Sequence, residues 1–428
     1  MKHTYYKKFN EHLYYQKLDN GLDVYLVPKP EYHKVFATFT TNYGAIDLSF
    51  IPHGSERKVT QPAGIAHFLE HKMFAMPDKT DAFETLSNFG VSANAFTSMD
   101  KTSYLFSGTE NIKEAVNYLL DYVQTPYFTK SSVIKEQGII AEELLMYLDN
   151  PPRRIRSGLL RNLYKKHPIR IEGIGTMDSI YKITPHRLYQ AYNSFYHPSN
   201  MNFILTGNFD QEEMFELIKA NQASKNYEIQ KPVEKIFPKE QLKVANSEET
   251  IEMSIGMPYV GVGVKLPPKG DLKEQYRTSL VLQILLDLYL SNSSDDIQKL
   301  LKAGIINQSF SYYPLVVPNI KAIIISSMTA NPEAFKTEIS KLLVNLKRRK
   351  ISETEFEIYK KSYYGSFIRS LNSLENISFG LINTIPYGIN LFEIPELIQT
   401  IEIADLVEQA KEIKRDRIAT FTIMPKKV

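Results

Sequence analysis

The sequence predicts an α+β protein made of two copies of one domain, each a mainly antiparallel sheet packed with helices. Three observations support this prediction. The chain has 428 residues, which is too long for one ordinary domain. Strand-like segments occur in adjacent pairs among helical segments, as in layered α+β domains. Part of the second half also repeats the pattern of the first.

The first half contains both kinds of element in a clear order. Residues 22–30 and 35–46 are rich in β-branched and aromatic residues between turn residues, so we expect strands there. Residues 64–74 and 82–90 are expected to be helices, and Gly90 ends the second as a favoured C-terminal residue. Further strands are expected in 91–98, 102–109 and 200–210, and further helices in 111–126 and 130–149.

The second half is expected to be a degenerate copy of the first. Residues 223–240 are polar, contain proline and lack periodicity, which predicts a linker between domains 1–222 and 241–428. FETLSNFGVSANAF (83–96) aligns with IQKLLKAGIINQSF (297–310), so that Gly90 falls on Gly304. At the same offset, the polar residues of the HFLEH motif described below fall on Val281, Ile284 and Leu285.

Composition excludes several classes of function. The net charge of +3 is too small to indicate a nucleic acid or an anionic membrane as partner. The most apolar run, SLVLQILLDLYL, is too short to span a bilayer and predicts a buried helix. The N-terminal residues have no apolar signal region, so we expect a cytoplasmic protein. The chain has no cysteine, so a metal must be held by His and carboxylate groups.

HFLEH, residues 67–71, is the strongest motif. On a helix, His67 and His71 share one face and Glu70 lies beside them. Two such imidazoles can hold one divalent metal ion, and the carboxylate can move protons. The alternative is the ordinary polar edge of an amphipathic helix. We favour the metal site because H-x-x-E-H spacing is found among zinc peptidase signatures.

The helix expected at 130–149 offers a third ligand. Glu136 and Glu143 are seven residues apart and share a face that Tyr147 continues. Glu142 points about 100° away, and we expect it to face solvent. Geometry alone therefore leaves either Glu143 or Glu136 as the inward-facing ligand. The alternative is that these carboxylates are ordinary helix surface charge.

HFLEH followed about seventy residues later by E-x6-E resembles the pitrilysin/insulinase family of zinc metallopeptidases, which includes the mitochondrial processing peptidases. The stretches ANAFTSMDKTSYLF and HPIRIEGIGTMDSIYKITPHRLYQAYNSFYHPSNMNFILTGNFD also resemble that family, most closely its short Gram-positive members. The resemblance implies two insulinase-like α/β-roll domains. It also implies that His67, His71 and Glu143 are the ligands of one Zn²⁺, that Glu70 is the general base and that Glu136 is a supporting acid. The strand residues that would pair with the substrate are Asn94, Ala95 and Phe96.

One feature of the family pattern is missing. Second domains of such proteins often carry an Arg and a Tyr, seven residues apart, that contact the substrate backbone. Here Leu300 or Leu301 occupies the Arg position and Asn307 the Tyr position. The resemblance therefore implies a zinc endopeptidase for extended peptides, working as a heterodimer with a homologous subunit that lacks HxxEH and supplies the Arg/Tyr pair.

Two alternatives are weighed against this function. A non-catalytic scaffold or assembly subunit of the same fold is the first, and the complete set of His67, Glu70, His71 and Glu143 argues against it. The second is a nucleotide- or serine-dependent enzyme. The chain has no Walker loop and no G-x-S-x-G, and GVGVKLPPKG (261–270) lacks phosphate-loop spacing.

Overall fold

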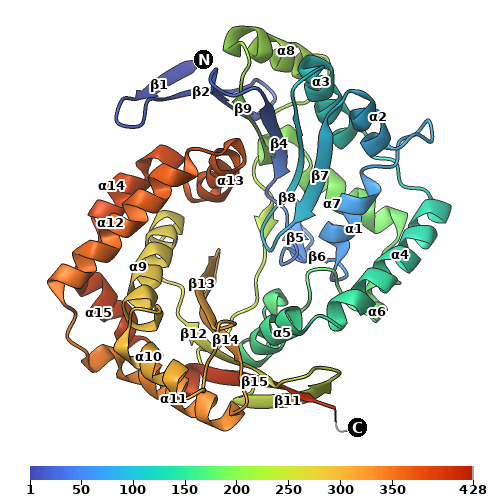
Figure 1. Ribbon diagram of the computed structural model, residues 1–428. Helices are drawn as coiled ribbons and strands as arrows, with labels where there is room; N and C mark the ends of the chain where they lie inside the picture. Colours follow the sequence, from blue (N-terminus) through green and yellow to red (C-terminus); the bar gives the residue numbers. More distant parts are fainter. Residues whose placement is uncertain (427–428) are drawn as a thin grey trace. The chain divides into compact units, whose positions relative to one another are not determined.

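The computed structural model describes residues 1–426, which form two compact units (Figure 1). The first unit contains residues 1–142, 172–237 and 368–386, and the second contains 143–171, 238–367 and those from 387 onward. Each unit therefore includes a segment from the other half of the chain. The domain boundaries 1–222, 223–240 and 241–428 stay a prediction, because the units are defined by contacts and not by chain order.

The first unit is built on a seven-stranded sheet. Its strand order is β1 (Lys2–Tyr6), β2 (Glu11–Lys17), β3 (Asp23–Pro28), β9 (Met201–Gly207), β4 (Val35–Thr41), β8 (Thr102–Gly108) and β7 (Ser92–Thr97). Every pair is antiparallel except β3 with β9. A small sheet joins β10 (Glu234–Lys235), β5 (Ser49–Ile51) and β6 (Val59–Thr60), so the segment predicted as a linker also contributes a strand.

Helices cover both faces of this sheet, and every residue of the central strand β4 is buried. One face packs against α1 (Ile65–Lys72), α2 (Ala82–Asn88) and α3 (Ile112–Val123). The other face packs against α13 (Leu374–Thr384), which comes from late in the chain (Figure 1). The remaining helices that lie wholly within this unit are α6 (Met177–Ile180), α7 (Pro185–Phe195) and α8 (Gln211–Ala223).

The second unit repeats this plan with five strands. Its order is β11 (Glu248–Met253), β15 (Ile418–Pro425), β12 (Tyr259–Leu266), β14 (Ile320–Met328) and β13 (Ser311–Val317). The pair β11 and β15 is parallel and the others are antiparallel. This order matches β3-β9-β4-β8-β7 of the first unit, including the position of the parallel pair. The prediction of an α+β protein with mainly antiparallel sheets is confirmed.

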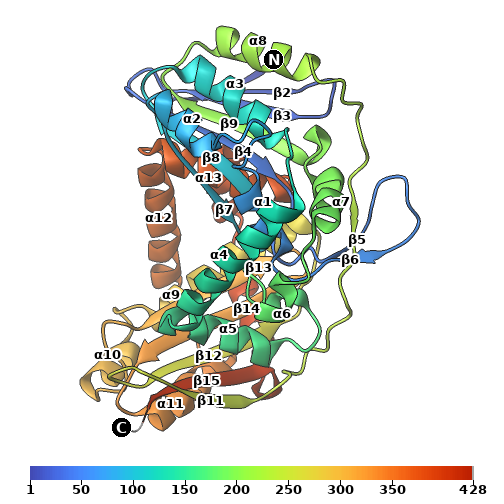
Figure 2. The same ribbon diagram turned by 90° about the vertical axis from the view of Figure 1, so that its right-hand side faces the viewer.

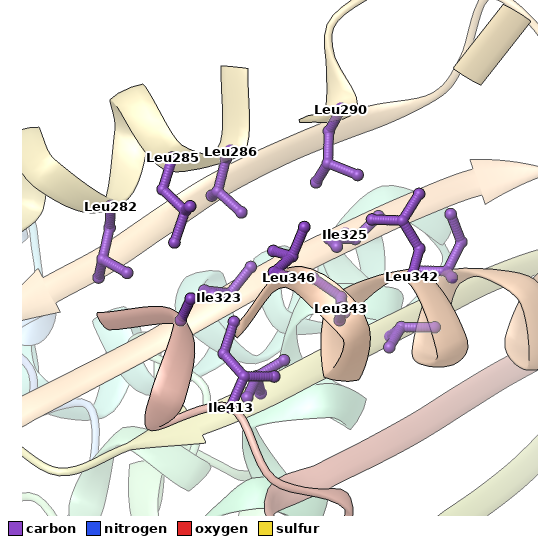
Figure 3. Packing of buried hydrophobic residues seen from close by; sticks show 14 of the residues in the cluster. Leu282, Leu285, Leu286, Leu290, Ile323, Ile325, Leu342, Leu343, Leu346 and Ile413 are labelled. Atoms are coloured by element: carbon purple, nitrogen blue, oxygen red, sulfur yellow. The ribbon is translucent and has the colours of Figure 1, made fainter. Parts of the chain in front are cut away.

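One helix layer and the sheet of the second unit enclose a dense aliphatic core. The helices that line this core are α9 (Leu272–Leu290), α10 (Asp295–Lys302), α11 (Pro332–Asn345), α12 (Glu353–Ser370) and α15 (Ile403–Lys411), and α14 (Ile394–Gln399) packs against α9. Figure 3 shows leucines of α9 pointing toward isoleucines of β14 and leucines of α11. The apolar run predicted as a buried helix forms part of α9. Across the described chain, every helix is too short or too polar to cross a lipid bilayer.

The GVGV sequence of β12 has a packing explanation. Val260, Val262 and Val264 point into the aliphatic core, so the glycines between them point to the opposite face. That face packs against α5 (Pro151–Leu163), a helix from the first half of the chain (Figure 2). A Cβ atom at Gly261 would lie 2.7 Å from Leu159 Cδ1. The glycines therefore allow close approach of helix and sheet and need no phosphate-binding function.

We predict that Gly261→Ala destabilises the protein, because the added methyl group must displace Leu159 or Ile155 of α5. Overpacking of this kind costs about 1–3 kcal/mol. The free energy of unfolding from urea denaturation measures the effect. Gly256→Ala is the matched control, because a Cβ atom at that exposed position meets no atom within 4 Å. Equal stability of the two variants would contradict this account of the α5 contact.

Candidate metal centre

Helix α1 carries the HFLEH motif, and its burial sets which residues face outward. Ile65, Phe68 and Leu69 are fully buried on one side of the helix. His67, Glu70 and His71 lie on the other side and are half-buried. The helix begins after Gly64, whose φ of 87° and close approach to the Ile174 carbonyl oxygen exclude a side chain. The sequence therefore places the motif on a short, firmly packed helix.

His67, His71 and Glu143 come together as a possible metal site. The two imidazole centroids are 4.5 Å apart, and one ligand atom from each of the three residues lies within 4.8 Å of the others. Within residues 1–426, this is the one cluster of three or more His, Cys, Asp or Glu side chains with that geometry. Zinc binds His nitrogen and carboxylate oxygen at about 2.0–2.2 Å. Small side-chain adjustments would bring all three donors to one ion, so the residues fit zinc.

Helix α4 (Lys130–Leu148) supplies the carboxylates. It is one continuous helix, although the boundary between the two compact units falls between Glu142 and Glu143. Glu142 is exposed, as the helical spacing predicts, whereas Glu143 and Glu136 are half-buried. Burial and the neighbouring Glu143 carboxylate raise the pKa of Tyr147, and the Arg153 guanidinium lies 3.5 Å from that ring. Of the two carboxylates that spacing left open, Glu143 joins the metal cluster and Glu136 does not.

Glu136 contacts the cluster through His71. The His71 Nδ1 and Glu136 Oε1 atoms are 3.1 Å apart, and Lys72 Nζ is 3.5 Å from Glu136 Oε2. Burial of Glu136 opposes ionisation, but the His71 hydrogen bond and the Lys72 charge hold the pKa of Glu136 below its usual value. An ionised Glu136 accepts the proton on Nδ1. His71 then presents the lone pair of Nε2 as a ligand.

Glu70 is held by a different partner. Thr97 Oγ1, at the end of strand β7, donates a hydrogen bond of 2.6 Å to Glu70 Oε2. Thr97 also lies 3.3 Å from the Thr102 hydroxyl of β8, which donates to the carbonyl oxygen of Tyr43. Glu70 stands outside the three-residue cluster, as a general base should, because a coordinated carboxylate is a poor base.

Strand β7 contains the predicted substrate residues and forms an edge of the seven-stranded sheet. Asn94 is exposed and Ala95 is half-buried. The Phe96 ring packs edge-on against Phe379 of α13, with centroids 5.8 Å apart. The Phe96 side chain therefore takes part in internal packing, and its backbone is the part that the sheet edge presents.

The second unit has apolar residues at the positions that correspond to the motif. Val281, Ile284 and Leu285 are almost completely buried in the aliphatic core. Leu300 is also buried, and Leu301 packs against the same core. The Asn307 side-chain oxygen accepts hydrogen bonds from the Ser309 backbone and hydroxyl group. These positions therefore provide no guanidinium or phenol group.

Two site residues were missed by sequence reasoning, Lys72 and Thr97. Lys72 follows HFLEH directly. A lysine on the buried side of the motif helix is unusual, and this could have indicated a site residue from the sequence. Thr97 lies within the stretch expected as a strand. Its contact with Glu70 joins residues 27 positions apart, which no local pattern indicates.

Comparison with known proteins identifies the family of this chain. Residues 45–176 match the insulinase (peptidase family M16) model, and residues 182–363 match the model of the M16 inactive domain. The chain is 38% identical to the uncharacterized zinc protease YmfH of Bacillus subtilis over 98% of each chain. It is 24% identical to zinc protease PqqE of Helicobacter pylori over 95% of this chain and 91% of that one.

Solved structures show the same fold. A structure from Alicyclobacillus acidocaldarius described as M16-like is 32% identical, with a TM-score of 0.91 over 97% of this chain and 99% of that one. A chain of complex III2 from Candida albicans is 16% identical, with a TM-score of 0.73 over 96% of this chain and 95% of that one. At that identity, the likeness concerns the fold alone.

We predict that Glu143→Ala removes most bound zinc, whereas Glu142→Ala keeps it, because only Glu143 joins the histidine cluster. Zinc per chain, measured by elemental mass spectrometry after dialysis, tests this; we expect one ion for the unchanged protein. His67→Ala should behave like Glu143→Ala. Loss of zinc from Glu142→Ala with retention in Glu143→Ala would reverse the assignment.

Proposed function

Because the chain belongs to the M16 (insulinase) peptidase family, we propose that it is a zinc-dependent endopeptidase of the inverted-motif type. The observation that carries this proposal is the cluster of His67, His71 and Glu143 with Glu70 beside it but outside it. Three protein ligands leave a position for water, which is typical of catalytic zinc sites. The relatives' names as zinc proteases support the same metal.

The chain's own residues account for the proton transfers. When bound, zinc would supply a Lewis acid that activates water and stabilises negative charge on the scissile carbonyl oxygen. Glu70 accepts the proton of the attacking water and delivers it to the leaving amine. The Thr97 hydroxyl donates a hydrogen bond to Oε2 of Glu70 and so orients the carboxylate that exchanges protons. Glu136 keeps His71 in the tautomer that binds metal through Nε2.

Strand β7 suits a peptide in extended conformation. As an edge strand, it offers backbone N–H and C=O groups to one further strand. Asn94, Ala95 and Phe96 would pair with the peptide through the main chain. Recognition of this kind reads the backbone more than the side chains, so we expect peptides or unfolded segments as substrates, with loose sequence specificity.

We predict that Glu70→Gln keeps zinc and still binds peptide but loses nearly all hydrolysis. The amide cannot accept the proton, and removal of a general base costs on the order of 10² to 10⁴ in rate. Cleavage of a fluorogenic peptide measures the loss. Glu142→Gln, the same change at an exposed site on α4, is the control. An undiminished rate of peptide cleavage in Glu70→Gln would rule out this mechanism.

We also propose that the chain works with a homologous subunit. The positions expected to carry the Arg/Tyr pair hold Leu300 or Leu301 and Asn307, so this chain lacks two donors to the substrate backbone. A homologue without HxxEH but with the Arg and Tyr would complete the site. A homodimer would bring two zinc sites and still no such pair.

A scaffold function is the second candidate. The observation that raises it is the likeness in fold to a chain of complex III2 from Candida albicans. The intact set of His67, Glu70, His71 and Glu143 favours the peptidase, because a scaffold would have no need of it. A zinc assay beside a peptide-cleavage assay separates the two functions.

We predict that the isolated chain cleaves peptides slowly and that the homologue restores the rate. Each missing transition-state donor is worth about 3–4 kcal/mol, or roughly 10² to 10³ in rate. The test mixes the purified chain with the candidate subunit and follows both mass and peptide cleavage. A subunit with its Arg changed to Leu is the control. Full activity of the isolated chain, unchanged by the homologue, would refute the split site.

A further inference from the structure

Lys72 is a buried cation beside the candidate metal centre. It is the last residue of α1 and follows the proposed ligand His71 directly. Its side chain is only 5% exposed, and its ammonium group lies 3.5 Å from Glu136 Oε2. Burying an ammonium ion is costly unless a charge partner compensates it. A polar or apolar residue would fit this site at lower cost, so the presence of lysine needs a reason.

The two oxygens of Glu136 are occupied by different donors. His71 Nδ1 lies 3.1 Å from Oε1, and Lys72 Nζ approaches Oε2. A carboxylate held at both oxygens cannot rotate about its terminal bond without losing one of these contacts. Lys72 therefore fixes the orientation of the oxygen that accepts from His71. The imidazole plane and the direction of Nε2 depend on that contact.

The same arrangement separates two otherwise similar carboxylates of α4. Glu143 joins the histidine cluster, whereas Glu136 faces His71 and Lys72. With both oxygens engaged, Glu136 acts as an acceptor for the ligand and does not compete as a fourth ligand. That leaves the position for water that a catalytic zinc site needs.

We propose that Lys72 is a positioning residue of the metal centre, acting on His71 through Glu136. This inference rests on the proposed zinc site. Loss of partners that orient metal ligands typically reduces metal affinity 10- to 100-fold. Lys72 is one contact further from the metal than Glu136, so we expect about a tenfold loss when it is replaced.

A purely structural lysine would behave differently. A cation in the last turn of α1 also interacts favourably with the helix dipole. Such a lysine would affect the stability of the metal-free protein but not the affinity for zinc. Zinc affinity and metal-free stability are therefore the two readouts that distinguish the possibilities.

The experiment compares Lys72→Met, Lys72→Arg, Glu136→Gln and the double variant Lys72→Met/Glu136→Gln. Zinc affinity is measured on metal-stripped full-length protein by competition with a chromophoric chelator, and thermal unfolding of the same samples monitors the fold. We expect Lys72→Met to bind zinc about tenfold more weakly and Lys72→Arg to retain most of the affinity. The double variant should bind no more weakly than Glu136→Gln alone, because Lys72 acts through Glu136.

Each other outcome overturns one specific claim. If Lys72→Met binds zinc like the unchanged protein, or if the two losses add in the double variant, Lys72 does not act through Glu136. If the unchanged protein binds no zinc, the proposed function fails first. Should Lys72→Met not fold, Lys72→Gln, which removes the charge but keeps a polar side chain, takes its place in the same comparison.

Discussion

The burial of one side of α1 is the constraint on which the candidate site depends. Ile65, Phe68 and Leu69 are completely buried. Fully burying each such side chain contributes about 1.5–3 kcal/mol. A rotation of α1 by one residue, about 100°, would expose part of this set. The helix is therefore held at one rotation, and the half-buried side must present the motif residues together.

Because α1 and α4 are both regular helices, the site needs little help from loops. His67, Glu70 and His71 are fixed relative to each other by helical geometry, and Glu143 lies two turns beyond Glu136 on its own helix. The contacts of Glu136 with His71 and Lys72 tie the two helices together. Sites built on regular elements hold their geometry more closely than sites on loops.

Local patterns predicted the elements well, and long-range contacts account for what was missed. The spacing of HFLEH, Gly90 as a helix terminator and the exposure of Glu142 all follow from helical geometry, and the structure agrees with each. The contact of Thr97 with Glu70 joins a strand to a helix. Helix α5 belongs to the second unit and α13 to the first, so each unit contains a helix from the other half of the chain. Periodicity describes single elements, so it cannot predict which distant elements contact each other.

The glycines of β12 illustrate the same limit. In sequence, Gly261 and Gly263 lie in a stretch that lacks the spacing of a phosphate-binding loop, and nothing local explains their presence. In the structure they alternate with core valines and leave space for Leu159 of α5. Their role is explained only by the packing of α5, a helix about one hundred residues earlier in the chain.

The location of Thr97 bears on how base and substrate are aligned. Thr97 ends β7, the edge strand on which the peptide is proposed to pair, and its hydroxyl holds Glu70. The proposed base is therefore oriented by the same strand that would orient the scissile bond. A shift of that strand would move both together, which preserves their relative geometry. Hydrolysis depends steeply on that geometry, because misplacement by about 1 Å can cost on the order of 10² in rate. The hydrogen bond between Thr97 and Glu70 would thus keep the proposed base aligned with whichever bond of a paired peptide lies beside it.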